Sequence, residues 1–335
     1  MLVDVRNLSV SFATRDGTVR AVDRVSFKMS EGETLAVVGE SGSGKSVMCL
    51  SLMGLVPGAE RSGEVFFEGS ELLNLPKKAL QDLRGRRISM IFQDPLSSLN
   101  PYRRVGWQIA EAILVHESRS KTAIRKRVLE LLGLVGIPQP ARRIDDYPHQ
   151  LSGGMRQRVM IALSLSLDPA LLIADEPTTA LDVTVQAEIM ELLMRLRDEL
   201  GMALLLVTHD LALVAGVADR ILVMYAGRII EMGDRRTLYY APEHPYTWGL
   251  LGSVVSTASV RKQRLPSIAG QPPSLIHVPR GCAFHPRCGY VMEACRNDVP
   301  ELRSDAGRDR EAMAEHVTAC HLSHEQRTQL WKKAH

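Results

Sequence analysis

A glycine-rich run near residue 40 carries the residue types that hold phosphate groups. Residues 39–46 read GESGSGKS, which fits the pattern GxxxxGK[ST]. Its glycines let the backbone turn tightly, so that consecutive N–H groups point at phosphate oxygens. In such a loop Lys45 reaches the β- and γ-phosphates of a nucleotide, and the Ser46 hydroxyl ligates Mg²⁺. We therefore predict that one segment binds nucleotide phosphates: Gly39, Glu40, Ser41, Gly42, Ser43, Gly44, Lys45 and Ser46.

Two carboxylates follow an apolar run further along the chain. The run LLIADE (171–176) ends in Asp175 and Glu176, where a buried strand would leave its sheet. Asp175 suits the coordination shell of Mg²⁺, and Glu176 suits the orientation and deprotonation of an attacking water. Apolar strands that end in acidic residues also begin ordinary loops, so this run alone does not define an activity.

A third motif decides the class of protein. The run LSGGM (151–155), continued by RQR, opens a helix with small residues and offers a second phosphate-binding helix start. It resembles the signature sequence of the ATP-binding cassette (ABC) family. The phosphate loop, the signature and the segment LLIADEPT also stand in the order and spacing of that family. The resemblance implies that the ligand is ATP with Mg²⁺.

The same resemblance suggests roles for further residues. Gln93, in IFQDP, is similar to the family's Q-loop glutamine, which contacts Mg²⁺ and the attacking water and senses the membrane partner. Asp182, at the end of residues 180–182, resembles the D-loop aspartate, and His209 resembles the switch histidine that contacts the γ-phosphate. Phe12 lies where the family places an aromatic ring that stacks on adenine, although an aromatic at an alternating strand position also suits a core.

The resemblance also implies a mechanism. Two such domains close head to tail around two ATP molecules, and each site combines residues of one subunit with the signature of the other. The first set is Lys45, Ser46, Gln93, Asp175, Glu176 and His209, and the signature residues are Ser152, Gly153 and Gly154. Because no member of this set is degenerate, we expect the half-site of this chain to support hydrolysis.

The elements that must position these residues follow an α/β pattern. Short apolar runs suit strands buried on both faces of a mostly parallel sheet, and amphipathic helical stretches separate them. We expect strands at 34–38, 87–92, 170–175, 203–209 and 220–225, and helices at 46–54, 121–134, 155–166 and 183–200. Runs 2–10 and 19–29, with a turn at Asp16-Gly17, predict an antiparallel β-layer.

The predicted fold is therefore an α/β ABC ATPase cassette over residues 1–240. It has a mixed sheet core, an antiparallel β subdomain and a helical subdomain at about residues 95–160. From about residue 241 prolines become frequent, periodicity fades and cysteines arrive. This change predicts a small, loop-rich C-terminal appendage over residues 241–335.

Three segments narrow the resemblance to a subgroup. EHPYT (243–247) followed by Leu250-Leu251, GCAFHPRC (281–288) and SLNPYRRVGWQI (98–109) resemble ATPase subunits of dipeptide and oligopeptide importers. The leading prediction is therefore an ATPase that energises import of di- or oligopeptides. Relatives in that group also import glutathione, nickel complexes and some sugars, so these cargoes remain alternatives.

Four of the five cysteines lie in the appendage, spaced C-x5-C-x6-C-x24-C: Cys282, Cys288, Cys295 and Cys320. Four thiolates suit an iron–sulfur cluster or tetrahedral zinc, but the tight pairs typical of zinc are absent. Some members of the importer group carry a four-cysteine [4Fe–4S] cluster here, so the resemblance implies one; zinc and free thiols remain alternatives. His285, His316 and His321 are other possible ligands, and Cys49 is expected to be a small buried residue.

Charge and hydropathy limit the partners. The net charge of +3 argues against nucleic acid as a partner, despite a basic cluster at residues 84–87. No run of about 18 uncharged apolar residues occurs, so other subunits must supply a pore. The resemblance implies a second ABC ATPase subunit (a paralogue, giving a heterodimer), two transmembrane permease subunits and an extracytoplasmic substrate-binding protein.

The resemblance places the chain peripherally on the cytoplasmic face of the inner membrane. Two rivals are a non-transport ABC ATPase that acts on DNA or the ribosome, and an exporter subunit. The chain has one cassette and lacks the long coiled coils and zinc modules of the first rival. The importer-like C-terminal motifs argue against the second.

Overall fold

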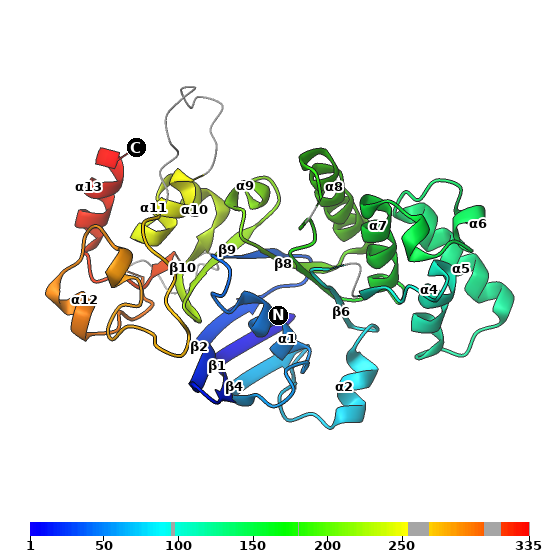
Figure 1. The fold of residues 1–335 in the computed structure, drawn as a ribbon, viewed down its shortest axis with the longest axis horizontal. Helices are drawn as coiled ribbons and strands as arrows, with labels where there is room; N and C mark the ends of the chain where they lie inside the picture. The colour runs from blue at the N-terminus through cyan, green and yellow to red at the C-terminus, as the bar shows by residue number, and fades with distance from the viewer. Residues whose placement is uncertain (95–97, 180, 254–267, 305–315, 335) are drawn as a thin grey trace. The chain divides into compact units, whose positions relative to one another are not determined.

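The computed structural model describes residues 1–94, 98–179, 181–253, 268–304 and 316–334. The chain forms two compact units. The first unit comprises residues 1–29, 34–73 and 208–335, and the second comprises residues 30–33 and 74–207. The second unit contains the part of the ribbon that runs from cyan to green in Figure 1.

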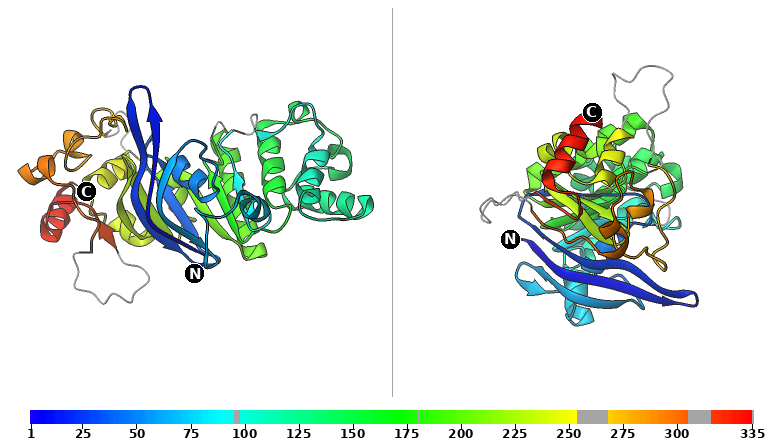
Figure 2. Two further views of the ribbon diagram at one scale, coloured as in Figure 1. Left: turned by 90° about the horizontal axis from the view of Figure 1, so that it is seen from below. Right: turned by 90° about the vertical axis from the view of Figure 1, so that its left-hand side faces the viewer.

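An antiparallel sheet of the first unit is built on two long strands, β1 (Val3–Thr14) and β2 (Gly17–Met29). They form the dark blue ribbon in Figure 2. β4 (Glu60–Phe67) pairs with β1, and β5 (Ser70–Glu71) pairs with β4. Along the end of β2, buried Val25, Phe27 and Met29 alternate with exposed residues, as expected for a half-buried strand. The predicted antiparallel layer is confirmed.

A second group of strands in the first unit begins with β3 (Thr34–Val38), which runs parallel to β9 (Arg220–Tyr225). β10 (Arg228–Asp234) and then β11 (Val317–Thr318) follow β9 in antiparallel order. β3 and β9 were predicted from the sequence, whereas β10 and β11 were not. β11 has only two residues, which is too short for a periodic pattern.

Short helices complete the first unit. They are α1 (Lys45–Leu52), α9 (Leu211–Val214), α10 (Arg235–Tyr240), α11 (Pro245–Gly252), the 3-10 helix η2 (His285–Arg287), α12 (Glu293–Asn297) and α13 (His324–Ala334). The C-terminal segment thus contributes helices and one strand to the same unit as the phosphate loop. The boundary near residue 241 stays a prediction.

The second unit is centred on three parallel strands, β6 (Ile88–Ile91), β7 (Leu171–Asp175) and β8 (Ala203–Thr208). Every residue of these strands is buried, which explains their nearly continuous apolar sequences. All three strands were predicted, each within two residues of its observed ends.

Helices fill the chain between and after these strands. They are α2 (Lys77–Leu83), α4 (Val105–Leu114), α5 (Lys121–Leu134), α6 (Pro140–Arg143), the 3-10 helix η1 (Pro148–Gln150), α7 (Gly153–Ser164) and α8 (Val183–Leu200). In Figure 1, α4 to α7 gather into one helical group, in the region where the sequence predicted a helical subdomain. Residues 95–97 of that prediction lie outside the described residues. None of the described helices is both long and apolar enough to cross a membrane.

Candidate active site

The predicted phosphate loop connects β3 to α1 in the first unit. A Cβ at Gly44, where φ is 100°, would lie 2.1 Å from the carbonyl oxygen of Ala21. A Cβ at Gly39 would lie 2.3 Å from the carbonyl oxygen of Met224. Backbone atoms of neighbouring segments therefore enclose the loop so tightly that only glycine fits at these two positions.

Lys45 begins α1 and turns back over the loop. Its Nζ donates to the carbonyl oxygens of Gly39 at 2.7 Å and Glu40 at 3.0 Å, and the residue is only 4% exposed. The buried Oγ of Ser43 has no hydrogen-bond partner among the described residues. The loop is thus surrounded by a cation (Lys45), the start of α1 and the hydroxyl of Ser43. This combination is suited to binding phosphate.

The predicted carboxylates lie at the end of β7 in the second unit. Asp175 is buried, and Glu176 has a left-handed backbone with φ 47°. The Oε2 of Glu176 accepts hydrogen bonds from Gln93 Nε2 and Thr179 Oγ1, both at 2.9 Å. The structure thus brings Gln93 and Glu176 together. Thr179 joins them, although it was not predicted from the sequence. The sequence signal that could have found it is a hydroxyl residue three positions after the carboxylate.

The signature opens α7 as predicted. Ser152 is the N-cap, and its Oγ accepts from the N–H of Met155 at 3.3 Å. A Cβ at Gly154 would lie 2.9 Å from Val185 of α8, so the close approach of the two helices demands a small residue. Asp182 caps α8 and accepts from the N–H of Val185 at 3.0 Å. Ala180, the first residue of the predicted D-loop, lies outside the described residues.

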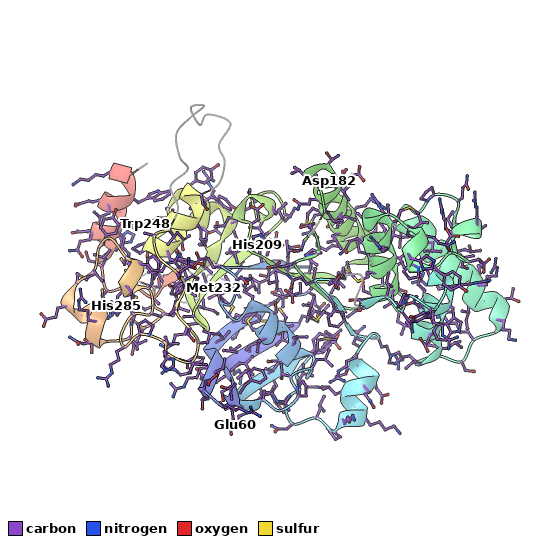
Figure 3. All side chains as sticks on the ribbon, viewed as in Figure 1. Glu60, Asp182, His209, Met232, Trp248 and His285 are labelled. Carbon is purple, nitrogen blue, oxygen red and sulfur yellow. The ribbon has the colours of Figure 1, made fainter. Side chains whose placement is uncertain are left out.

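His209 and Phe12 belong to the first unit. His209 follows β8, is exposed, and precedes Asp210, which caps α9 (Figure 3). Phe12 lies on β1 opposite Val19 and is half-buried. Part of its ring therefore remains accessible, as a stacking role requires.

The four C-terminal cysteines line one small pocket of the first unit: Cys282, Cys288, Cys295 and Cys320. None forms a disulfide, and His285 and His321 line the same pocket. Burial raises the pKa of the Cys282 thiol to about 11 and that of Cys320 to about 12. These two thiols are therefore neutral near pH 7 unless a metal displaces their protons.

Thiol groups are the ligand type that soft metals prefer. Among the described residues, no three His, Cys, Asp or Glu side chains lie close enough together to hold one metal ion. The Nε2 of His316 lies 2.8 Å from the carboxylate oxygen Oε1 of Glu231. Cys49 is fully buried in α1, as expected for a small core residue.

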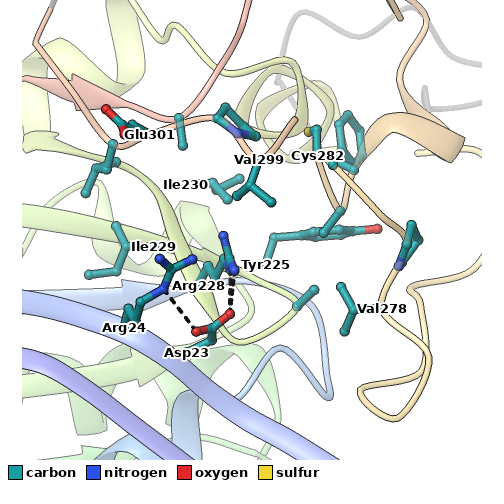
Figure 4. Close-up of a pocket in the computed structure, with 18 of the residues that line it drawn as sticks. Asp23, Arg24, Tyr225, Arg228, Ile229, Ile230, Val278, Cys282, Val299 and Glu301 are labelled. Atoms are coloured by element: carbon teal, nitrogen blue, oxygen red, sulfur yellow. Dashed lines mark hydrogen bonds and ion pairs between the residues drawn. The ribbon is translucent and has the colours of Figure 1, made fainter. Parts of the chain in front are cut away.

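A larger pocket, of about 610 Å³, lies beside the cysteine pocket (Figure 4). Cys282 and Tyr225 contribute to its wall, together with Arg228, which pairs with Asp23 at 2.6 Å. None of residues 39–46 lines this pocket, so it is separate from the phosphate loop.

Comparisons with known proteins agree with this description. The family model "ABC transporter" matches residues 22–179, and "Oligopeptide/dipeptide transporter, C-terminal region" matches residues 230–295. The oligopeptide transport ATP-binding protein OppD of Bacillus subtilis is 51% identical over 304 residues, which cover 90% of this chain and 85% of OppD. The dipeptide transport ATP-binding protein DppD of Haemophilus influenzae is 52% identical over 309 residues, covering 92% of this chain and 93% of DppD.

Solved structures show the same fold. A dimeric ATP-binding cassette in a post-hydrolysis state with ADP and Pi has a TM-score of 0.64 at 29% identity, covering 70% of this chain and 99% of the cassette. A cassette from Clostridium perfringens, part of an ABC transporter complex, has a TM-score of 0.62 at 31% identity. The match covers 72% of this chain and 91% of that cassette. Fold and motifs are those of an ATP-binding cassette. The chain belongs to the ABC transporter family, among the ATP-binding proteins that carry the oligopeptide/dipeptide transporter C-terminal region.

Proposed function

We propose that this chain is the ATP-hydrolysing subunit of a membrane importer of di- or oligopeptides. The observation that carries the proposal is the C-terminal region, whose family model covers residues 230–295. Relatives named for oligopeptide and dipeptide transport are about half identical to this chain over nine tenths of its length, which supports the same activity. The chain is an ATPase that couples ATP hydrolysis to this transport.

The proposed roles follow the chemistry of each residue. Lys45 and the N–H groups of residues 39–46 hold the phosphates, and Ser46, Gln93 and Asp175 hold Mg²⁺. Glu176 orients and deprotonates the attacking water, with its carboxylate held by Gln93 and Thr179. His209 contacts the γ-phosphate, and Phe12 stacks on adenine. Ser152, Gly153 and Gly154, with Asp182 nearby, serve the ATP of a partner subunit.

The proposed assembly has a paralogous ABC ATPase as that partner, giving a heterodimer. Two transmembrane permease subunits form the channel, and an extracytoplasmic binding protein delivers the cargo. The chain itself lies peripherally at the inner membrane. The permease and binding-protein partners are supported by relatives that are ATP-binding proteins of transport systems.

Reconstitution tests the cargo. The chain is assembled with its permeases, its partner ATPase and its binding protein in vesicles, and phosphate release is measured with each candidate cargo. Di- or oligopeptides should stimulate hydrolysis and accumulate inside, whereas nickel complexes, glutathione and sugars should not. Stimulation by one of the other cargoes alone would overturn the peptide assignment while leaving the ATPase intact.

We also propose that Cys282, Cys288, Cys295 and Cys320 hold a [4Fe–4S] cluster. Their convergence on one pocket supports this, since four thiolates are the usual ligands of such a cluster. When bound, the cluster supplies an electron-accepting group and cross-links the segment from residue 282 to residue 320.

Anaerobic purification tests the cluster. We expect about four irons and four sulfides per chain, with broad visible absorption, and loss of both in Cys288→Ser. Cys49→Ala is the matched control, because Cys49 lies in α1 outside the pocket, and it should keep its iron. Protein without iron would exclude the cluster, and bound zinc in its place would assign the pocket to that metal.

A further inference from the structure

One arginine of the cysteine segment reaches the phosphate loop. The Arg287 side chain is only 4% exposed, and its Nη1 and Nη2 lie 2.5 and 2.9 Å from the two carboxylate oxygens of Glu40. Arg287 directly precedes Cys288, and Glu40 directly follows Gly39 of the loop. The contact joins residues 247 positions apart, within one compact unit.

Every N–H group of the Arg287 guanidinium donates a hydrogen bond. Its Nε donates to the carbonyl oxygen of Ala269 at 2.9 Å, and its remaining N–H groups reach Ile268 at 3.4 Å and the hydroxyl of Tyr225 at 3.3 Å. With the two bonds to Glu40, all five N–H groups have acceptors. Two-pronged, charge-assisted pairs of this kind hold both partners in one geometry. The pair raises the pKa of the Arg287 guanidinium, so this side chain stays charged.

A second contact holds the backbone of the same residue. The N–H of Glu40 donates to Tyr246 Oη at 2.8 Å, and Tyr246 is fully buried. Its ring packs against Tyr225 and Phe284, with centroids 4.7 and 5.4 Å away. Phe284 lies between Cys282 and Cys288 in sequence and lines the cysteine pocket. Tyr246, which holds the backbone of Glu40, therefore packs against a residue that lines that pocket.

The position of Glu40 matters to the loop through both its carbonyl oxygen and its charge. The carbonyl oxygen of Glu40 accepts from Lys45 Nζ and from the N–H of Ser43, so Glu40 helps to shape the loop. A carboxylate in a loop that binds phosphates repels them, more strongly where water is excluded. Arg287 neutralises that carboxylate and holds it against the C-terminal segment.

We propose that Arg287 is a positioning residue for ATP binding, acting through Glu40. It neutralises the Glu40 carboxylate and, with Tyr246, holds the loop in the form that accepts phosphates. The cysteine segment is thereby coupled to the nucleotide site of the same chain. The inference rests on the proposed role of residues 39–46.

Equilibrium binding of a fluorescent ATP analogue to the full-length chain, with Mg²⁺, tests the proposal. Arg287→Gln leaves the Glu40 carboxylate unpaired and should weaken binding by about tenfold, because the repulsion between that carboxylate and the phosphates is no longer offset. Arg287→Gln combined with Glu40→Gln removes the repulsive charge and should recover affinity to within about threefold of wild type. Arg296→Gln, an exposed arginine of α12, is the matched control and should bind normally.

A purely structural role would give another pattern. It predicts that the double variant binds no better than Arg287→Gln, and that affinity follows thermal stability across the series. That outcome, or wild-type affinity in a folded Arg287→Gln protein, overturns the proposal. If Arg287→Gln fails to fold, Tyr246→Phe removes only the acceptor of the Glu40 N–H. It should weaken ATP binding about threefold, and unchanged affinity counts against the proposal.

Lys45→Ala separates this inference from the proposed function. If wild-type protein binds no ATP, or Lys45→Ala binds as well as wild type, the assignment of residues 39–46 fails. If Lys45→Ala loses binding while Arg287→Gln and Tyr246→Phe keep it, the assignment stands and only the role of Arg287 is lost.

Discussion

At the scale of the residue, Glu176 is held both at its side chain and at its backbone. Its carboxylate accepts from Gln93 and Thr179, and its backbone is held in a left-handed conformation that few non-glycine residues adopt. The N–H of Glu176 donates to the carbonyl oxygen of Val207 in β8 at 2.9 Å, which ties this conformation to the neighbouring strand. Such constraint suits a group that must present one oxygen to a water.

The first prediction concerns Glu176 as the proposed general base. Glu176→Gln keeps the size and polarity of the side chain but cannot accept a proton, so hydrolysis should fall by at least about 100-fold while ATP binding persists. Phosphate release and equilibrium ATP binding, measured on the same preparation, check this. Turnover at the wild-type rate would remove Glu176 from its role.

The second prediction concerns Thr179, whose hydroxyl donates to the carboxylate of that proposed base. Thr179→Val deletes one hydrogen bond of about 0.5–1.5 kcal/mol and should lower kcat by roughly three- to tenfold with little change in the KM for ATP. Thr179→Ser retains the hydroxyl and should restore most of the rate. Equal activity of the Val and Ser variants would show that the hydroxyl does not position Glu176.

At the scale of the element, β10 and the C-terminal strand β11 meet at a buried carboxylate. Glu231 of β10 has no exposed surface, and it accepts from the N–H groups of Glu243 at 2.5 Å and His244 at 3.1 Å. The ring of His316, just before β11, lies 2.8 Å from the same carboxylate. This cluster attaches the end of the chain to the edge of β10.

The third prediction is a pH dependence of that attachment. Burial lowers the pKa of His316, but the hydrogen bond and charge of Glu231, with Glu243 and Asp234, outweigh burial and raise it overall. A raised pKa means that the protonated ring stabilises the fold below about pH 6.5 and that this stability is lost as the pH rises through the raised value. His316→Gln should therefore cost on the order of 1 kcal/mol at pH 6 and less at pH 9.

Denaturant unfolding at the two pH values measures this difference. His324→Gln is the matched control, because His324 pairs with Glu243 at 2.8 Å but its side chain is 61% exposed, so its effect should be smaller at both pH values. A destabilisation by His316→Gln that is the same at pH 6 and pH 9 would contradict the charge argument.

At the scale of the whole molecule, the first unit joins segments from both ends of the chain. Residues 1–29 and 34–73 share it with residues 208–335, and the phosphate loop contacts Tyr246 and Arg287 inside it. If these contacts strengthen ATP binding, bound ATP must in turn stabilise these contacts by the same free energy, because coupling between two sites is reciprocal.

The fourth prediction follows from that reciprocity. Binding of ATP with Mg²⁺ should slow amide hydrogen exchange in residues 281–296, although they lie outside the proposed phosphate loop. Exchange measured by mass spectrometry with and without ATP checks this, and Lys45→Ala, which should not bind ATP, is the control. Protection confined to the phosphate loop would show that the C-terminal segment does not sense the nucleotide.

The sequence by itself determined the parts whose chemistry is local. The tight backbone path of residues 39–46 could be predicted because glycines at fixed offsets leave few other conformations, which agrees with the crowding at Gly39 and Gly44. β3, α5 and α8 were located to the residue, because an apolar run of five or a helical period of more than a dozen residues is a strong pattern. The family membership followed from the order of such motifs.

Only the tertiary structure decided which distant residues meet. Nothing in the local pattern pairs Arg287 with Glu40, or makes Tyr246 the acceptor of a loop N–H. β10 and β11 escaped the sequence analysis, and with them the buried cluster around Glu231. Periodicity in the sequence encodes which face of a helix or strand is buried. The residues that pack against that face depend on strand order and on the fold of the C-terminal segment. Both arise only when the chain packs.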